Sequence, residues 1–167
     1  MKKEQSLFRV LTFILVPFGA LMGLVGLFAL AMALANISAL FSAFIMIAFT
    51  IYVFTSLTFL TKGIDMGRPM KHSLRDWIRV NAYVSGFMAI MSLVNVASIM
   101  IMSDASLQEF SEKFMQSQSN LPPMLNKSFF VSAIKAAAWF MGILSIILLI
   151  HIYLNFRLMK MYRNLFQ

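Results

Sequence analysis

Residues Val10–Ala35 read VLTFILVPFGALMGLVGLFALAMALA, a stretch without a single charged side chain. A helix needs about 20 apolar residues to cross a bilayer, and this stretch is longer. The start of the chain, with Lys2 and Lys3 ahead of the stretch, resembles a secretory signal. The apolar core of such a signal has only about 7–15 residues, so the length favours an uncleaved first membrane helix.

This segment belongs to the first of four long apolar stretches in the chain: Leu7–Ala35, Ala39–Leu60, Ile78–Met102 and Phe129–Tyr153. Hydrophobic residues make up 60% of the 167 residues and charged residues 12%, against roughly 25% charged residues in an average soluble domain. We therefore predict an all-α integral membrane protein. Short connections between successive spans favour an up-down-up-down bundle of four transmembrane helices, with residues 1–167 forming one domain.

The basic residues are distributed unevenly around these four stretches. Eleven lie near the two termini or between the second and third stretches, and only Lys113, Lys127 and Lys135 lie elsewhere. By the positive-inside rule, both termini should be cytoplasmic. The basic residues between the second and third spans should contact anionic lipid headgroups: Lys62, Arg68, Lys71, Arg75 and Arg79. The short loops and the Lys-Lys start suit a bacterial inner membrane.

The segment between the third and fourth stretches, about Ser103–Ser128, is predicted to lie outside and to contain a short amphipathic helix. Ser106-Leu107-Gln108-Glu109 has the pattern of a capping box. Apolar residues recur at helical spacing: Leu107, Phe110, Phe114 and Met115. The helix should end before Asn120–Pro123. It should rest on the membrane or the bundle; a lid or a partner contact is the alternative.

Asp104 and Lys135 are both expected near the outer edge of the hydrocarbon. Asp104 follows the third stretch, and Lys135 lies about 20 residues from the inner end of the fourth. A long lysine side chain at this depth can reach water or a nearby carboxylate. We predict an ion pair between these two residues.

One face of the first span consists of small residues. Gly19, Gly23, Gly26 and Ala33 fall within a narrow arc of a helix, and Gly19 and Gly23 form a small-xxx-small pair. Small residues allow two helix backbones to approach closely. We expect this face to pack inside the bundle, and a homo-oligomer interface is the alternative.

The third span carries a stripe of polar residues on one face: Asn81, Ser85, Ser92 and Asn95. Amides and hydroxyls in hydrocarbon need hydrogen-bond partners, which polar side chains of the second span could supply. The candidates are Thr50, Tyr52, Thr55, Ser56 and Thr58. Interhelical bonding is our expectation, and a substrate or ion path along the stripe is the alternative.

The sequence nominates no catalytic, cofactor-binding or metal-binding residue. There is no cysteine, which excludes thiolate nucleophiles and thiolate-bound metal. No acidic residue lies inside a span, and His151 is the only histidine in one. His151 and Asn155, one turn apart, are expected to make hydrogen bonds near the inner interface. Basic residues that flank apolar spans suit lipid headgroups better than nucleic acid.

We therefore expect a non-enzymatic membrane protein that acts through helix-mediated association, as an accessory or regulatory subunit. Its partner would be a second copy or another membrane protein. The first alternative is a small oligomeric transporter or channel with a path along the polar stripe of the third span. An enzyme acting on a lipid-soluble substrate is a weaker alternative, because paired carboxylates and paired histidines are missing from the spans.

Overall fold

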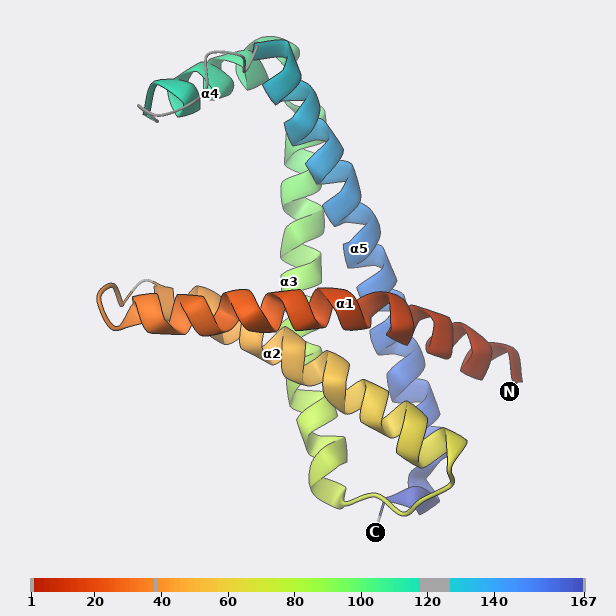
Figure 1. Cartoon of the computed structure of the whole chain (residues 1–167). Coiled ribbons are helices and arrows are strands. Elements are labelled where there is room, and N and C mark those ends of the chain that lie inside the picture. Colours follow the sequence, from red (N-terminus) through yellow and green to blue (C-terminus); the bar gives the residue numbers. More distant parts are fainter. Residues whose placement is uncertain (1, 38, 118–126, 167) are drawn as a thin grey trace. The chain divides into compact units, whose positions relative to one another are not determined.

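The computed structural model describes residues 2–37, 39–117 and 127–166, and in these residues the chain is helical without a β-strand (Figure 1). The long helices are α1 (Lys2–Ala33), α2 (Ala39–Thr58), α3 (His72–Ile101) and α5 (Lys127–Met161). A π-helix, η1 (Phe59–Asp65), continues α2. The shorter α4 (Asp104–Ser117) and the 3-10 turn η2 (Arg163–Leu165) complete the described elements. Four of these segments are long and apolar enough to cross a membrane, α2 together with η1 counting as one.

The helices extend beyond the apolar stretches at their basic ends. α1 already begins at Lys2, α3 begins at His72, and α5 continues to Met161. Hydropathy locates the part of a helix that suits hydrocarbon, whereas the backbone hydrogen bonds of a helix continue equally well through charged residues. At these basic ends the predicted spans therefore stop short of the helix ends.

The helix of the second span continues past Gly63. Gly63, which follows Lys62, resembles the glycine that ends a helix, but it lies inside η1. The positive φ of 62° falls instead at Gly67, whose N–H donates to the Gly63 carbonyl at 3.0 Å. The helix therefore continues through Gly63 as π-helical turns, and the terminating glycine comes one turn later, at Gly67.

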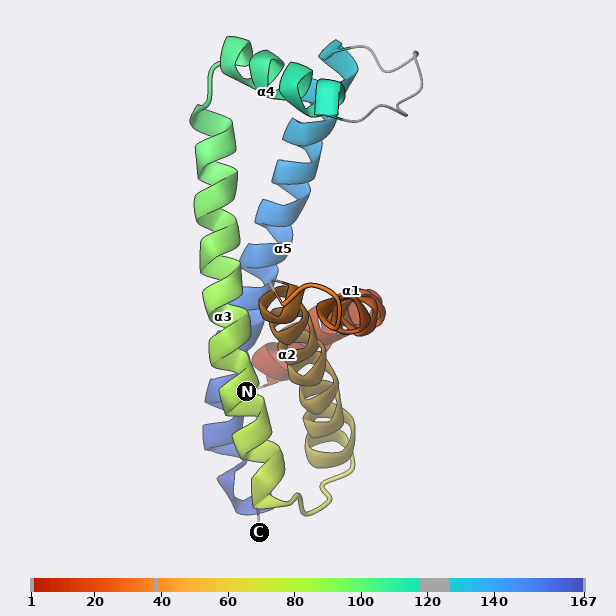
Figure 2. The same cartoon turned by 90° about the vertical axis from the view of Figure 1, so that its left-hand side faces the viewer.

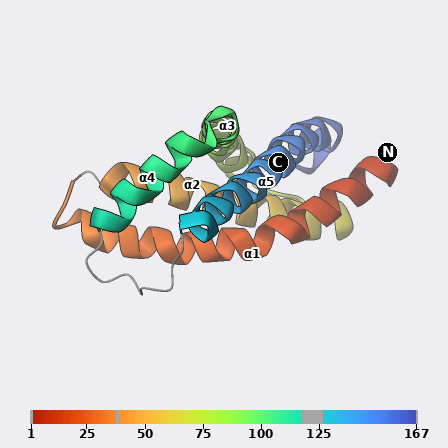
Figure 3. The same cartoon turned by 90° about the horizontal axis from the view of Figure 1, so that it is seen from above.

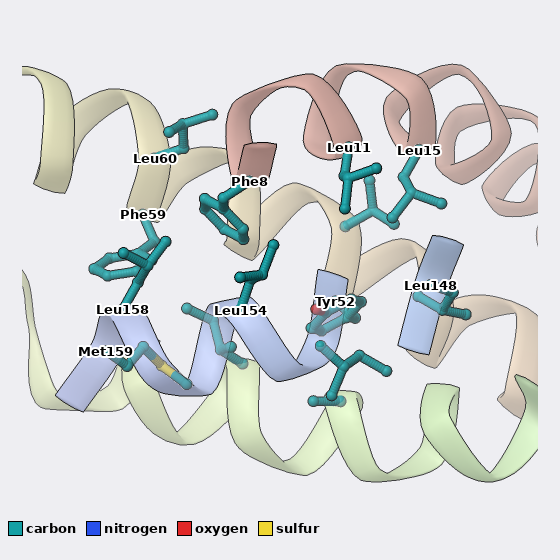
Figure 4. Packing of buried hydrophobic residues seen from close by; sticks show 14 of the residues in the cluster. Phe8, Leu11, Leu15, Tyr52, Phe59, Leu60, Leu148, Leu154, Leu158 and Met159 are labelled. Carbon is teal, nitrogen blue, oxygen red and sulfur yellow. The ribbon is translucent and has the colours of Figure 1, made fainter. Parts of the chain in front are cut away.

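The chain divides into two compact units, which we describe separately. The first comprises Met1–Ala89 and Ile147–Gln167, and its core is shown in Figure 4. Phe8, Leu11 and Leu15 of α1 pack there with apolar side chains of α2, η1 and α5. The second unit comprises Ile90–Ile146.

In the first unit, α1 and α2 form an antiparallel hairpin, visible from the side in Figure 2 and from above in Figure 3. The parts of α3 and α5 that belong to this unit contact each other, since the rings of Tyr83 and Phe156 lie 5.7 Å apart. α1 crosses this part of α5 instead of running along it (Figure 1). The up-down-up-down bundle of four helices stays a prediction.

In the second unit, the N-cap of α4 lies three residues before Ser106, where the capping-box pattern begins. Ser103 is the N-cap, because its Oγ accepts a hydrogen bond from the Ser106 N–H at 3.2 Å. Leu107 is buried and Phe110 exposed, so only part of the predicted apolar face is covered. The expectations for the side chains of Phe114 and Met115, and for a helix end before Asn120–Pro123, lie outside the described residues.

On the exposed face of α4, two side chains one helical turn apart form an ion pair. Lys113 Nζ donates to Glu109 Oε1 at 2.7 Å. This hydrogen bond, together with the charge of the ammonium group, lowers the pKa of the Glu109 carboxyl and raises the pKa of Lys113. The pair is fully open to solvent, so it keeps the face of α4 polar but adds little to stability.

Large apolar side chains cover much of the outer surface of the spanning helices. Within the most apolar window of α3 only 11% of the residues are buried, and within that of α1 only 17%. Exposed examples are Phe28, Phe87 and Trp139. Such a surface is unfavourable in water and suits lipid, which agrees with a multi-pass membrane protein.

Candidate functional site: a buried polar cluster

Polar side chains of three helices meet in the core of the first unit. Each helix presents two residues four positions apart on one face, so that both point the same way from successive turns. The pairs are Phe8 and Thr12 of α1, Tyr52 and Ser56 of α2, and His151 and Asn155 of α5. All six are at most 1% exposed. We call the five polar members, Thr12, Tyr52, Ser56, His151 and Asn155, the polar cluster.

His151 is the centre of the polar cluster. Its Nε2 lies 2.9 Å from Thr12 Oγ1, and its Nδ1 lies 2.7 Å from the Tyr52 hydroxyl. The Phe8 ring stacks on the imidazole with 4.7 Å between centroids and 17° between planes. The imidazole is thus held by α1 on one nitrogen and by α2 on the other.

The donor and acceptor roles of these side chains follow from the partners that each atom has. Thr12 Oγ1 lies 2.7 Å from the Phe8 carbonyl, which can only accept, so the hydroxyl proton of Thr12 is used there. Thr12 must then accept from His151 Nε2–H. His151 Nδ1 in turn accepts from the Tyr52 hydroxyl, which gives a neutral imidazole protonated at Nε2.

Asn155 extends the network by one turn of α5. Its Nδ2 donates to Ser56 Oγ at 2.6 Å and approaches the Tyr52 hydroxyl at 3.5 Å, a distance at which a hydrogen bond is weak. Its Oδ1 is buried and has no hydrogen-bond partner among the described residues. The amide therefore binds α2 through its nitrogen and has a spare acceptor.

This arrangement suits a structural connection better than catalysis. A histidine acting as a base or a metal ligand needs an accessible lone pair, and the acceptor nitrogen of His151 is occupied by Tyr52. The described residues contain no group of three histidine or acidic side chains that could hold a metal ion. What the polar cluster can do is tie α1, α2 and α5 to one another with directional bonds.

Three further contacts hold the start of α1 against the rest of this unit. Glu4 pairs with Arg157 of α5 at 2.9 Å, and Arg9 pairs with Asp65 of η1 at 2.5 Å. Gln5 donates to the hydroxyl of Tyr162, which follows α5. Polar side chains thus tie α1 to the same neighbours at its charged start and in the buried core.

The small-residue face of α1 lies against α2. A Cβ placed on Gly19 would be 2.9 Å from Val53 Cγ1, and one on Gly23 would be 2.9 Å from Thr50 Cγ2. One on Gly26 would meet Met46 at 3.2 Å. The close approach also lets the Thr50 hydroxyl contact the Gly19 carbonyl at 3.1 Å.

Ala33, the last predicted member of that face, is half-buried at the end of α1. A side chain of α2 in the same chain thus fills the space beside each of the three glycines.

Among the described residues, no hydrogen bond links the polar stripe of α3 to another helix. Asn81 is buried, but its Nδ2 donates to the Trp77 carbonyl of its own helix at 2.8 Å. Ser85 Oγ is buried without a hydrogen-bond partner among the described residues. Ser92 is half-buried and Asn95 exposed. α2 instead directs Tyr52 and Ser56 to α5.

The structure brings Asp104 and Lys135 together. Lys135 Nζ donates to Asp104 Oδ1 at 2.6 Å, and the side chains are 40% and 74% exposed, respectively. The contact joins the first turn of α4 to α5 within the second unit. Its position at the edge of a membrane stays a prediction.

The five basic residues predicted to contact headgroups lie at one end of the first unit. Lys62 and Lys71 line a shallow surface hollow beside Trp77. Arg75 and Arg79 line a larger one, about 580 Å³, which α5 completes. Arg68 is exposed beyond the end of η1.

Sequence reasoning missed the polar cluster as a unit. It noted that His151 and Asn155 stand one turn apart but expected only an interfacial role. The available signal was that Tyr52 and Ser56 have the same spacing, as do Phe8 and Thr12. No family model, no curated protein and no solved structure matches the chain.

Proposed function

We propose that the chain is a non-enzymatic multi-pass membrane protein that acts through helix-mediated association, as an accessory or regulatory subunit. The observation that carries this proposal is the polar cluster, in which buried polar groups of three helices bond to one another. Side chains used in this way hold helices in a fixed arrangement. They are not directed at a substrate.

The proposal includes an arrangement in the membrane. All eleven basic residues that we assign to the cytoplasmic side belong to the first unit, and the other three belong to the second. We place both termini in the cytoplasm of a bacterial cell and α4 on the outside of its inner membrane, with four spans in up-down-up-down order. The charge asymmetry supports this orientation through the positive-inside rule.

Since the glycine face of α1 is occupied by α2, a partner has to use other apolar faces, which are exposed. Val94 of α3 and Ile143 of α5 are 54% and 55% exposed, and both belong to the second unit. Either a second copy or another membrane protein could pack there in place of lipid, with van der Waals contacts as the main source of affinity.

A photoreactive amino acid at Val94 or Ile143, introduced into the full chain in its native membrane, tests the proposal. We expect illumination to give a protein adduct of defined mass at one of these positions. The same residue at the buried Phe49 is the control and should react only within its own chain. Adducts with lipid alone at both exposed positions would contradict helix-mediated association.

A further inference from the structure

A basic hollow lies between α3 and α5 at their charged ends, in the first unit. Its volume is about 580 Å³, and four basic residues line it: Arg75, Arg79, Lys160 and Arg163. The aromatic side chains of Tyr83 and Phe156 also contribute to its wall. The polar cluster contributes no residue to this wall.

The lining residues are ordered along the two helices. Arg75, Arg79 and Tyr83 follow one another at intervals of four along α3, so they share one face. On α5 the order runs the other way, with Phe156 first, then Lys160, and Arg163 just beyond the helix. The rings of Tyr83 and Phe156 contact each other at 5.7 Å, one turn inward from the charged residues on both helices.

The charges of this hollow are poorly compensated by the protein. The first unit has three acidic residues, of which Glu4 and Asp65 pair with arginines outside the hollow. The third, Asp76, lies 3.9 Å from Arg75 Nε, at the limit of an ion pair. Among the described residues, no ion pair includes Arg79, Lys160 or Arg163. Arg75 Nε is buried and has no hydrogen-bond partner there.

We propose that the basic hollow binds a phosphate group. Four positive charges gathered without matching carboxylates repel one another, and a bound anion relieves that repulsion. The planar forks of three arginines offer paired N–H donors that match phosphate oxygens, and the lysine adds a mobile point charge. The volume is within the range of small-molecule sites.

The same ligand chemistry is available from a phospholipid headgroup and from a soluble phosphate compound. The aromatic pair favours the lipid, since it lies where the glycerol and the first acyl carbons would follow the phosphate toward the apolar part of the helices. Aromatic side chains are enriched at this depth of a bilayer. The site does not depend on helix-mediated association, so either proposal can fail without the other.

The test uses the full chain in phosphatidylcholine nanodiscs, with phosphatidylglycerol as the probe and native mass spectrometry as the readout. Arg79→Gln combined with Lys160→Gln removes two cations from the hollow. We expect affinity for phosphatidylglycerol to fall at least about 100-fold, because two charge-assisted bonds are lost. The matched control, Arg68→Gln with Lys71→Gln, removes the same amount of charge from the basic end of the first unit but outside the hollow. We expect the control to lower the affinity for phosphatidylglycerol by no more than about 25-fold, because that is the effect of two charges near an anionic surface.

Two further samples separate loss of folding from loss of binding and identify the source of the phosphate. Arg79→Lys with Lys160→Arg keeps the charge of the hollow and should retain binding. Inorganic phosphate, added to nanodiscs of phosphatidylcholine alone, should raise the melting temperature if the ligand is soluble and leave it unchanged if the ligand is the lipid. A rise in melting temperature, or an unchanged one together with the selective loss of phosphatidylglycerol binding in the hollow variant, supports a phosphate site. Equal losses in the hollow and control variants, or no response to either probe, would overturn it.

Discussion

Tyr52→Phe removes one oxygen atom from the polar cluster and leaves the volume of the core almost unchanged. The lost hydroxyl donates to His151 Nδ1 at 2.7 Å, so the substitution leaves a buried acceptor without a donor. An interhelical hydrogen bond in a membrane protein contributes about 0.6 kcal/mol and rarely above about 1.7. A buried polar group left unpaired costs about 1–3 kcal/mol. We expect a loss of about 1–3 kcal/mol, most of it from the unpaired imidazole nitrogen.

Equilibrium unfolding of the purified chain in detergent measures this loss. Tyr153→Phe is the matched control, because Tyr153 is also on a spanning helix but is 62% exposed. None of the hydrogen bonds among the described residues involves the Tyr153 hydroxyl, so this variant should change stability by less than about 0.5 kcal/mol. If the two variants unfold alike, the polar cluster does not tie α1, α2 and α5 together.

Gly23→Leu should destabilise the chain by about 1–3 kcal/mol, since even a Cβ at this position would lie 2.9 Å from Thr50 Cγ2. Leu27→Ala, at a side chain that is 66% exposed, is the comparison for thermal melting in detergent, and equal melting of the two would show that the glycine face does not need close packing. Asp104→Asn, Lys135→Met and the double variant should give a coupling energy of about 0–1 kcal/mol in a double-mutant cycle, because both side chains are largely solvated. A loss of about 3–5 kcal/mol in either single variant would mean instead that this pair is shielded from water.

The sequence predicted the helices well because the hydrophobic requirement of a spanning helix is strong and local. Each apolar stretch coincides with a long helix, apart from the last two residues of Leu7–Ala35 and the last residue of Ile78–Met102. The ends were less accurate, because the helical backbone continues through charged residues, as it does at Lys2 and Met161. The continuation of the second span past Gly63 is not predictable, because the π-helical turns of η1 are not visible in hydropathy or in the spacing of residues.

The candidate site was only partly predictable. A helix face of glycines favours close contact with a neighbouring helix. Gly19 and Gly23 make such a contact with α2. Polar residues are harder to assign, because each can bond to its own backbone, to any neighbouring helix or to nothing. Asn81 bonds within α3. His151 instead reaches two other helices, and its choice depends on how α1 crosses α5, which no local pattern encodes.

The orientation of the chain in the membrane tests the central claim most directly, and the absence of cysteine makes the measurement simple. Single cysteines replace Met66, which is exposed after η1, and Gln108, which is exposed on α4. We predict that a membrane-impermeant thiol reagent labels Gln108→Cys in intact cells and reaches Met66→Cys only after the membrane is opened. Labelling of Met66→Cys from outside intact cells, or of both positions from the same side, would contradict a chain that spans the bilayer with its basic end in the cytoplasm.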